Sequence, residues 1–435
     1  MRPHATRWLA GLACLALQLA PTQASGEPGR EPDRPNGSGG INAPGHRQAP
    51  YLVLVSIDGF RWDYLDTYRL PAIAAIAAGG VRAERLVPVW PSLTFPNHYS
   101  IVTGMQPARH GLVSNDFFDP QAGRWYRMRD RGAVEDGSFY GGEPIWVTAE
   151  TQGMVAASFF WVGSEADVAG IRPTHWRSFD KRVSGEQRVD QVLAWLAQSP
   201  ERRPHLYTLY FEDVDDHSHG SGIGSQPFLA ALQKVDGYLA RLLAGIEALP
   251  HAPQVYLALV SDHGQLPYAN TPALVLEERV DLAGLELVDG GAFVFGWPRA
   301  GYEGDLEALA MAINRDWAHG RAYLRDEAPR AWRLAGNPRW PSLIVQADPG
   351  HAVLSSAARR EKISAADHGW APGAPDMHGI FIARGPGIRP GQRLGPVHVT
   401  DLYPLFCAML GLRPAGDLDS DPAVFEGLLE SARSE

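Results

Sequence analysis

The chain of 435 residues carries 39 basic and 49 acidic side chains, which gives a formal net charge of −10. With 45% hydrophobic and 20% charged residues, it has the composition of a globular protein and is long enough for one large domain or two moderate ones. The acidic balance excludes a basic groove that follows nucleic acid. It leaves phosphate chemistry open, because a local cation can neutralise a phosphate ester.

The N-terminus has the three parts of a secretory signal peptide. Arg2 and Arg7 precede an apolar run over 8–20, and Thr22-Gln23-Ala24 offers a small–x–small cleavage site. The run is shorter than the roughly 20 apolar residues of a membrane span. We therefore expect residues 1–24 to be removed, with an uncleaved anchor as the alternative. The mature protein is predicted to be periplasmic or secreted and to have no membrane span.

The next segment, 25–48, is rich in Gly, Pro, Ser, Asn and charged residues, and we expect it to be a disordered leader. Removal of the signal peptide takes Cys14 with it and leaves Cys407 as the only cysteine. No internal disulfide is therefore expected.

From Tyr51 onward, apolar runs alternate with longer amphipathic stretches. Four apolar runs have the pattern of strands buried on both faces: 51–57, 206–211, 255–260 and 379–383. Helices are expected over 70–78, 189–196 and 228–249. This alternation predicts an α/β fold with a mostly parallel central sheet and helices on both faces. The less regular segment 272–362 has candidate strands at 292–297 and 342–346, and we expect a small inserted subdomain there.

Acidic and histidine residues follow three of these strands. Asp58 ends the first, the stretch from Glu212 to His219 follows the second, and Asp262-His263 ends the third. The carboxyl ends of parallel strands form one rim, where ligands bind. Carboxylates and imidazoles with little sulfur suit a pair of divalent cations. A turn or a surface position is the alternative for any single residue, but it does not explain the whole set.

A candidate nucleophile lies in the stretch from Pro91 to His98. Pro96 suits the first turn of a helix that runs to about Thr103 and stops at Gly104. Thr94 would then lie just before the helix N-terminus, where free N–H groups favour an alkoxide or a bound phosphate. The alternative is that Thr94, or Ser92 nearby, only caps the helix. Beside a metal rim, the hydroxyl is instead expected to ionise and attack.

These motifs together resemble the nucleotide pyrophosphatase/phosphodiesterase family of the alkaline phosphatase superfamily. In chain order they are Ser56–Arg61, Thr94–His98, Thr103-Gly104, His110-Gly111, Phe160–Glu165, Tyr210–His219, Asp262–Gly264, His368-Gly369 and Gly385-Pro386. The resemblance covers about residues 50–415. It implies an alkaline phosphatase-like catalytic domain over 49–415, followed by a C-terminal tail over 416–435.

The resemblance also implies two zinc ions as cofactors. One would be held by Asp58, Thr94, Asp262 and His263, and the other by Asp215, His219 and His368. The D-x-x-x-H spacing of the family favours His219 over His217. Asp213, Asp216 and His378 are then expected to be local hydrogen-bonding or surface residues.

For the reaction, the resemblance implies that Thr94 forms a covalent phospho-threonine intermediate. Asn115 would contact a phosphate oxygen, and Phe95 and Tyr210 would enclose the base of a nucleotide substrate, with core packing as the alternative for both aromatic residues. The expected partner is a small nucleotide or another small phosphodiester.

The chain departs from the family pattern close to the expected substrate. Val162 stands where Pro is usual, Asp213-Val214 replaces Glu-Pro, and Ser218 replaces Gly. None of these changes removes a ligand, so they affect the preferred leaving group more than the chemistry. Hydrolysis of choline-type or other small phosphodiesters, of phosphonates or of phosphomonoesters by the same metal core is the alternative function. A sulfatase is disfavoured because the nucleophile motif differs, and a non-catalytic binding protein would keep this set of residues without using it.

Overall fold

The computed structural model describes residues 39–429. The predicted signal peptide and most of the predicted leader lie outside the described residues. The last part of the leader, residues 39–48, packs against the folded domain. Asn42 is only 1% exposed, and its side-chain amide donates to the carbonyls of Pro200 and Arg203. This part of the segment is therefore fixed by hydrogen bonds to the loop before β8.

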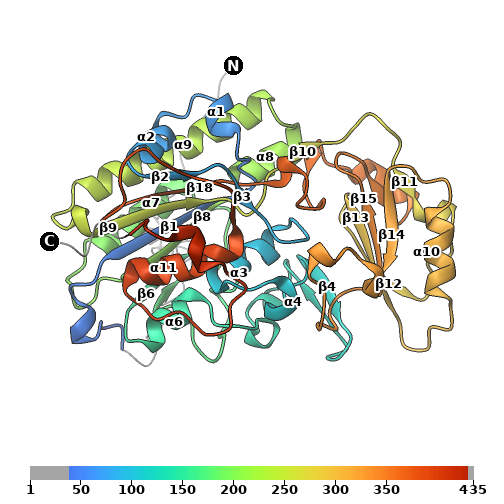
Figure 1. Cartoon of the computed structure of the whole chain (residues 1–435), viewed down its shortest axis with the longest axis horizontal. Coiled ribbons are helices and arrows are strands. Elements are labelled where there is room, and N and C mark those ends of the chain that lie inside the picture. The colour runs from blue at the N-terminus through green and yellow to red at the C-terminus, as the bar shows by residue number, and fades with distance from the viewer. Residues whose placement is uncertain (1–38, 430–435) are drawn as a thin grey trace, which may run out of the picture.

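An eight-stranded sheet forms the centre of the molecule (Figure 1), with the strand order β19-β2-β18-β9-β1-β8-β6-β7. The bounds are β1 (Tyr51–Ile57), β2 (Val81–Ala83), β6 (Ala156–Phe159), β7 (His175–Trp176), β8 (Leu206–Phe211), β9 (Val255–Val260), β18 (Phe381–Arg384) and β19 (Gln392–Leu394). Within the described chain, β18 alone runs antiparallel to its neighbours, β9 and β2. The expected mostly parallel α/β sheet is confirmed.

Helices cover both faces of this sheet. Those on one face are α2 (Pro71–Ala78), α7 (Gly185–Leu196) and α9 (Gln226–Glu247), and those on the other are α3 (Thr94–Thr103), α6 (Ile145–Thr151) and α11 (Leu402–Leu410). The central strand β1 shows why both faces are needed. Val53 and Val55 pack into the core beneath α2, α7 and α9, whereas Leu52 and Leu54 pack into the core beneath α3, α6 and α11. Figure 1 shows the sheet between α2 and α9 on one side and α6 and α11 on the other.

The starts of α7 and α9 are set by capping side chains. Ser184 accepts from the N–H of Gln187, whose side chain accepts in return from the N–H of Ser184. This capping box makes α7 begin four residues before the expected position at 189. Ser225 caps α9, which is 22 residues long. Within residues 39–429, no helix combines the length and the apolar character that crossing a membrane requires.

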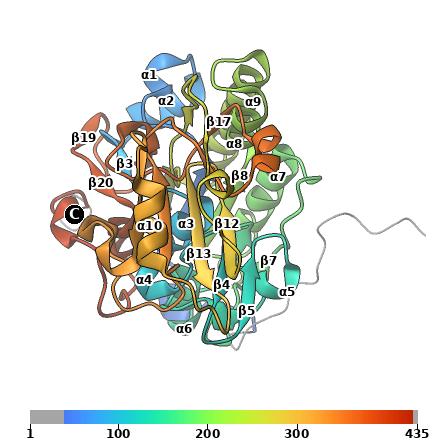
Figure 2. The same ribbon diagram turned by 90° about the vertical axis from the view of Figure 1, so that its right-hand side faces the viewer.

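A second sheet lies at one end of the molecule, at the right of Figure 1 and facing the viewer in Figure 2. Its four strands are antiparallel, in the order β12-β13-β15-β14, and α10 (Leu306–Asn314) accompanies them. The bounds are β12 (Leu285–Asp289), β13 (Phe293–Pro298), β14 (Gly320–Leu324) and β15 (Leu343–Ala347). All of them fall inside the segment expected to be an inserted subdomain, and β13 and β15 match its two candidate strands with a shift of one residue.

Shorter elements connect the two sheets. They are β3 (Leu86–Val87), β4 (Asp116–Asp119), β5 (Arg124–Arg127), β10 (Leu266–Pro267), β11 (Leu274–Val275), β16 (Val353–Leu354), β17 (Ala366–Asp367), β20 (Val397–His398), α1 (Tyr64–Thr67), α4 (Pro107–His110), α5 (Arg131–Val134) and α8 (Asp213–Ser221). Of these, α8 follows β8 and β17 pairs with β10 just after β9, so both lie at the carboxyl end of the central sheet.

Candidate active site

Thr94 is the first residue of α3, one position further into the helix than expected. Its Oγ1 lies 3.4 Å from Nε2 of His263. Neither residue of the capping alternative caps this helix. Leu93 occupies the N-cap position, and the hydroxyl of Ser92 donates instead to the carbonyl of Trp370. The Thr94 side chain is therefore directed at the histidine that follows β9.

The carboxyl ends of β1 and β9 bring one group of predicted ligands together. Asp58 directly follows β1, and Asp262 and His263 follow β9 after the single residue Ser261. Nε2 of His263 lies 3.0 Å from Oδ2 of Asp262 and 3.6 Å from Oδ1 of Asp58. All three side chains are buried. Residues about 200 positions apart in sequence thus share one small volume next to Thr94.

The other three predicted ligands form an adjoining group. Asp215 lies on α8, and its Oδ1 is 3.4 Å from Nε2 of His219 on the same helix and 3.8 Å from Nε2 of His368. His368, which directly follows β17, stacks on His263 with ring centroids 3.7 Å apart. The ligand atoms of Asp215, His263 and His368 all lie within 4.8 Å of one another, so the two groups are continuous.

The hydrogen bonds of two histidines direct their second nitrogen into the cluster. Nδ1 of His263 lies 3.0 Å from the carbonyl of Gly264, and Nδ1 of His368 lies 2.8 Å from the carbonyl of Ser92. Because a carbonyl only accepts, Nδ1 of each ring is the nitrogen that donates to it, and Nε2 is the nitrogen left to bind a cation. Metal-binding histidines are oriented in this way by backbone carbonyls.

The carboxylates of the cluster also suit a cation. Oδ1 of Asp58 is buried and accepts no hydrogen bond from the described residues, whereas Oδ2 of Asp262 lies 3.0 Å from Nε2 of His263. Burial, together with the negative charges of Asp262 and Asp215, raises the pKa of Asp58 well above its usual value. Three ionised carboxylates in one buried site repel one another unless cations offset their charge. The donor set, carboxylate and imidazole without sulfur, fits divalent cations such as zinc.

The pKa values of His219 and His368 shift in opposite directions. Burial alone would lower the pKa of His219, but Asp215 raises it to about 10. Burial and the neighbouring His263 lower the pKa of His368 to about 3. Burial alone would raise the pKa of Asp262, but His263 and the nearby His98 hold it well below its usual value. Each charged group of the cluster therefore shifts the pKa of its neighbours.

The sequence did not assign a role to His98, and the structure places its ring against the carboxylate of Asp262. Nδ1 of His98 lies 3.3 Å from Oδ2 of Asp262 and 2.9 Å from the carbonyl of Thr94, and its Nε2 lies 2.8 Å from the hydroxyl of Ser56. His98 stands inside the nucleophile motif, four residues after Thr94. The motif therefore includes His98 but does not predict its contact with Asp262.

Two more residues at this edge of the sheet were missed. Gln265, completely buried, donates its side-chain amide to Oδ1 of Asp215. Oδ1 of Asp367 lies 3.8 Å from Nδ1 of His219. Each follows or precedes a predicted ligand by one or two residues, which is the only signal that the sequence offered.

The structure places the remaining acidic and histidine candidates outside the cluster. Nδ1 of His217 lies 2.7 Å from the carbonyl of Asp213, whose carboxylate is 3.0 Å from the Nζ of Lys234. Asp216 forms an ion pair with Lys181 on the surface. Nε2 of His378 lies 2.7 Å from the carbonyl of Pro372.

A cavity of about 400 Å³ opens beside the cluster. Asp58, Thr94 and Asp215 line one part of it, and aromatic side chains line another: Phe95, Phe160, Trp161, Phe179 and Tyr210. Phe95 and Tyr210 are half-buried, so each offers a surface to the cavity and is not confined to the core. Asn115 lies near the nucleophile, because its Oδ1 accepts from the N–H of Phe95 at 2.8 Å.

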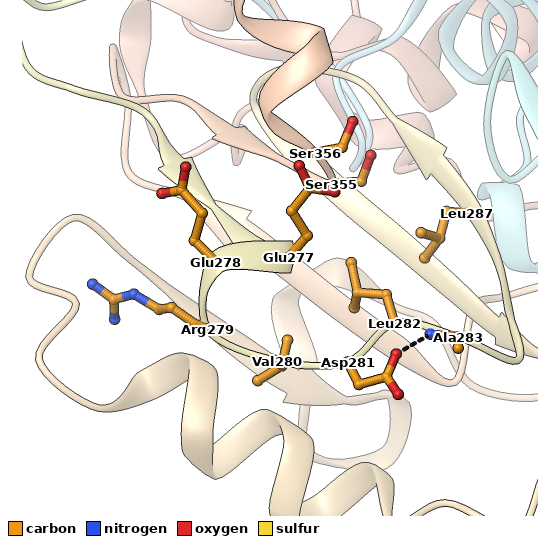
Figure 3. Close-up of a pocket in the computed structure, with 10 residues that line it drawn as sticks. All are labelled: Glu277, Glu278, Arg279, Val280, Asp281, Leu282, Ala283, Leu287, Ser355 and Ser356. Atoms are coloured by element: carbon orange, nitrogen blue, oxygen red, sulfur yellow. Dashed lines mark hydrogen bonds between the residues drawn. The ribbon is translucent and has the colours of Figure 1, made fainter.

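Another cavity, of about 640 Å³, lies in the segment around β12 (Figure 3). Glu277 and Glu278 line it, but both are engaged locally: the first accepts from the N–H of Ala357, and the second pairs with Arg360. None of its lining residues belongs to the cluster around Thr94.

Comparisons with known proteins agree with this geometry. The family model described as Type I phosphodiesterase / nucleotide pyrophosphatase matches residues 52–371. Ectonucleotide pyrophosphatase/phosphodiesterase family member 1 of Rattus norvegicus is 32% identical over 385 residues, which is 87% of this chain and 42% of that protein. Family member 5 of Homo sapiens is 30% identical over 363 residues, 83% of this chain and 74% of that protein. The chain thus spans about two fifths of the family member 1 relative.

A solved structure of murine family member 5 has the same fold. It superimposes with a TM-score of 0.82 at 28% identity, and the match covers 88% of this chain and 100% of that chain. That structure is of an inactive threonine-to-alanine variant in complex with AMP. The chain described here belongs to the type I phosphodiesterase/nucleotide pyrophosphatase family, within the alkaline phosphatase superfamily.

Proposed function

We propose that this chain is an exported two-zinc phosphodiesterase that cleaves phosphodiester or phosphoanhydride bonds of nucleotides, with Thr94 as its nucleophile. The observation that carries the proposal is the position of Thr94. It begins α3, 3.4 Å from His263, where a carboxylate–imidazole cluster meets an aromatic cavity. Export is supported by the predicted signal peptide and matches the word ectonucleotide in the names of the relatives.

Seven residues would hold the metal ions. Asp58, Thr94, Asp262 and His263 would bind one zinc, and Asp215, His219 and His368 the other. Bound zinc would lower the pKa of a coordinated hydroxyl or water and offset negative charge on the phosphoryl oxygens.

The residues of the chain would then carry the reaction. Oγ1 of Thr94 attacks phosphorus in line, the new bond to Oγ1 forms, and the bond to the leaving oxygen breaks. The resulting phospho-threonine ester is cleaved by water in a second step, which regenerates the hydroxyl. The N-terminus of α3 favours the negative charge that collects there. Because Oδ1 of Asn115 is occupied by the N–H of Phe95, its Nδ2 is the atom that can donate to a phosphate oxygen.

The nucleoside would lie in the aromatic cavity, with its base against Phe95 and Tyr210. Flat aromatic walls favour a planar group through stacking and apolar contact. The AMP complex of the murine relative supports a nucleotide. This cavity is also what favours nucleotides over choline-type phosphodiesters, phosphonates and phosphomonoesters, which the same metal cluster could process.

Hydrolysis of p-nitrophenyl thymidine monophosphate beside p-nitrophenyl phosphate tests this proposal, with and without a metal chelator. We expect a preference for the diester that the chelator abolishes and added zinc restores. Faster cleavage of the monoester would contradict the assigned substrate class. Full activity in excess chelator would contradict the proposed metal centre.

A further inference from the structure

Tyr210 touches both halves of the candidate site. Its ring lines the aromatic cavity, and its hydroxyl donates to Oδ2 of Asp58 at 2.6 Å. The strand register explains this contact. Tyr210 of β8 pairs with Ser56 of the neighbouring strand β1, and Asp58 follows two residues after Ser56, so the phenol and the carboxylate lie side by side at the ends of the two strands.

The ring of Tyr210 is held in a single orientation by its neighbours. His98 packs against it edge-on with ring centroids 5.3 Å apart, and Phe179 does so from a distance of 5.9 Å. Edge-to-face contacts of this kind favour one ring plane over others. These contacts favour the ring plane in which the hydroxyl points at Asp58.

The two oxygens of Asp58 are in different situations. Oδ2 accepts from Tyr210, whereas Oδ1 is buried and has no hydrogen-bond partner among the described residues. A donor on one oxygen fixes the plane of the carboxylate and leaves the other oxygen free to bind a cation. Partners of this kind around metal ligands typically change metal affinity when they are removed.

We propose that Tyr210 is a positioning residue for Asp58 as well as a wall of the nucleoside cavity, so that one side chain joins substrate binding to metal binding. The inference rests on the proposed function, because it takes Asp58 as a metal ligand. The hydroxyl serves the metal side of the site and the ring serves the nucleoside side, and the two can be separated by mutation.

The test is Tyr210→Phe, which removes the hydroxyl and keeps the ring. Tyr207→Phe is the matched control. Tyr207 lies three residues earlier on β8, and its buried hydroxyl has no hydrogen-bond partner among residues 39–429. Zinc affinity is measured by competition with a chromophoric chelator, without substrate. We expect Tyr210→Phe to bind zinc about 10- to 100-fold more weakly, and Tyr207→Phe to bind it as the wild type does.

Two substrates separate the ring from the hydroxyl. In Tyr210→Phe, kcat/KM should fall by the same factor for p-nitrophenyl thymidine monophosphate and for bis(p-nitrophenyl) phosphate, which has no base. Phe95→Leu should instead lose more activity on the nucleotide. In an Asp58→Ala background, adding Tyr210→Phe should have no further effect on zinc affinity, because the partner of the hydroxyl is already gone.

Unchanged zinc affinity in Tyr210→Phe would overturn the inference, as would a loss of activity confined to the nucleotide substrate. A further loss of zinc affinity in the Asp58→Ala background would overturn it too. Failure of the wild-type protein to bind zinc would be a different result, because it would overturn the proposed metal centre itself.

Discussion

The side-chain amide of Gln265 donates to Oδ1 of Asp215, the same oxygen that lies 3.4 Å from Nε2 of His219 and 3.8 Å from Nε2 of His368. Gln265 is completely buried and lies against Gly59, where an added Cβ would stand 2.8 Å from the amide nitrogen. The close fit around Gly59 and the bond to Asp215 hold the Gln265 side chain between the loop that follows β1 and helix α8. Each of the three carboxylates in the cluster therefore has its own donor: Tyr210 for Asp58, Gln265 for Asp215 and the N–H of Gly59 for Asp262.

Replacing Gln265 by Met tests the support of Asp215, because it removes the amide and keeps a similar volume. We expect a decrease of about 10-fold or more in zinc affinity or in kcat. KM for a nucleotide should change little, since Gln265 does not line the aromatic cavity. Zinc titration and steady-state kinetics check this expectation. A normal zinc affinity would show that the amide does not orient Asp215.

Replacing Arg188 by Met should destabilise the whole domain. The guanidinium, 2% exposed, makes two hydrogen bonds to Glu212 at 2.6 and 2.8 Å and one to the carbonyl of Tyr210. Loss of one partner leaves Glu212 buried without compensation, which costs about 3–5 kcal/mol. Urea unfolding should show this loss, and the double variant Arg188→Met/Glu212→Gln should recover part of it. Equal stability of the single variant and the wild type would contradict the expectation.

Replacing Asp58 by Asn should have opposite effects on stability with and without metal. In chelator, burial and the charges of Asp262 and Asp215 raise the pKa of Asp58, so its ionised form destabilises the fold at pH 8. Asn removes that charge, so the metal-free protein should become more stable. In zinc, the same variant loses a ligand and should be less stable than the wild type. Thermal unfolding in both conditions checks the inversion, and a loss of stability in chelator would contradict it.

The buried His110 should make stability depend on pH. Burial lowers the pKa of His110 to about 3, while the unfolded chain binds a proton at this residue below about pH 6.5. Above that pH both states are neutral, and the full stability is present. Between about pH 6.5 and 3 the unfolded state binds more protons, so stability falls as pH falls, by about 1.4 kcal/mol per pH unit.

The structure also shows why His110 resists protonation: its Nδ1 accepts from the N–H of Leu112 at 3.2 Å. His110→Gln should therefore reduce the loss of stability between pH 7 and pH 5, as measured by urea unfolding in chelator. Identical slopes in the variant and the wild type would assign the pH dependence to other groups.

The strands of the main sheet and the polar residues at their ends could be predicted from sequence because their signals are local. Apolar runs placed β1, β8 and β9, and the polar residues that end each run fell on the same rim. The resemblance to the family favoured His219 over His217, and the structure places Nε2 of His219 3.4 Å from Oδ1 of Asp215 while His217 faces the carbonyl of Asp213. The predicted start of α3 was one residue too late, because Pro96 was expected closer to the first helical position. The N–H groups of the whole first turn lack helical partners, so proline also fits at Pro96, two residues after the observed first residue, Thr94.

The supporting contacts could not be predicted, because they join residues far apart in sequence. The bond from Tyr210 to Asp58 spans 152 positions, and the bond from Gln265 to Asp215 spans 50. No local sequence pattern predicts which side chain of a buried strand or loop hydrogen-bonds to a given carboxylate. Such pairs depend on strand order and register, which appear only in the folded chain.

Peptide mapping of acid-quenched enzyme tests the role of Thr94 most directly. During turnover of a slowly cleaved nucleotide diester, we expect a nucleotidyl group on the peptide that contains Thr94. Thr94→Ala should lack this adduct and all turnover while still binding zinc. An adduct on another residue, or full activity of the zinc-bound Thr94→Ala variant, would contradict the assignment of Thr94 as the nucleophile.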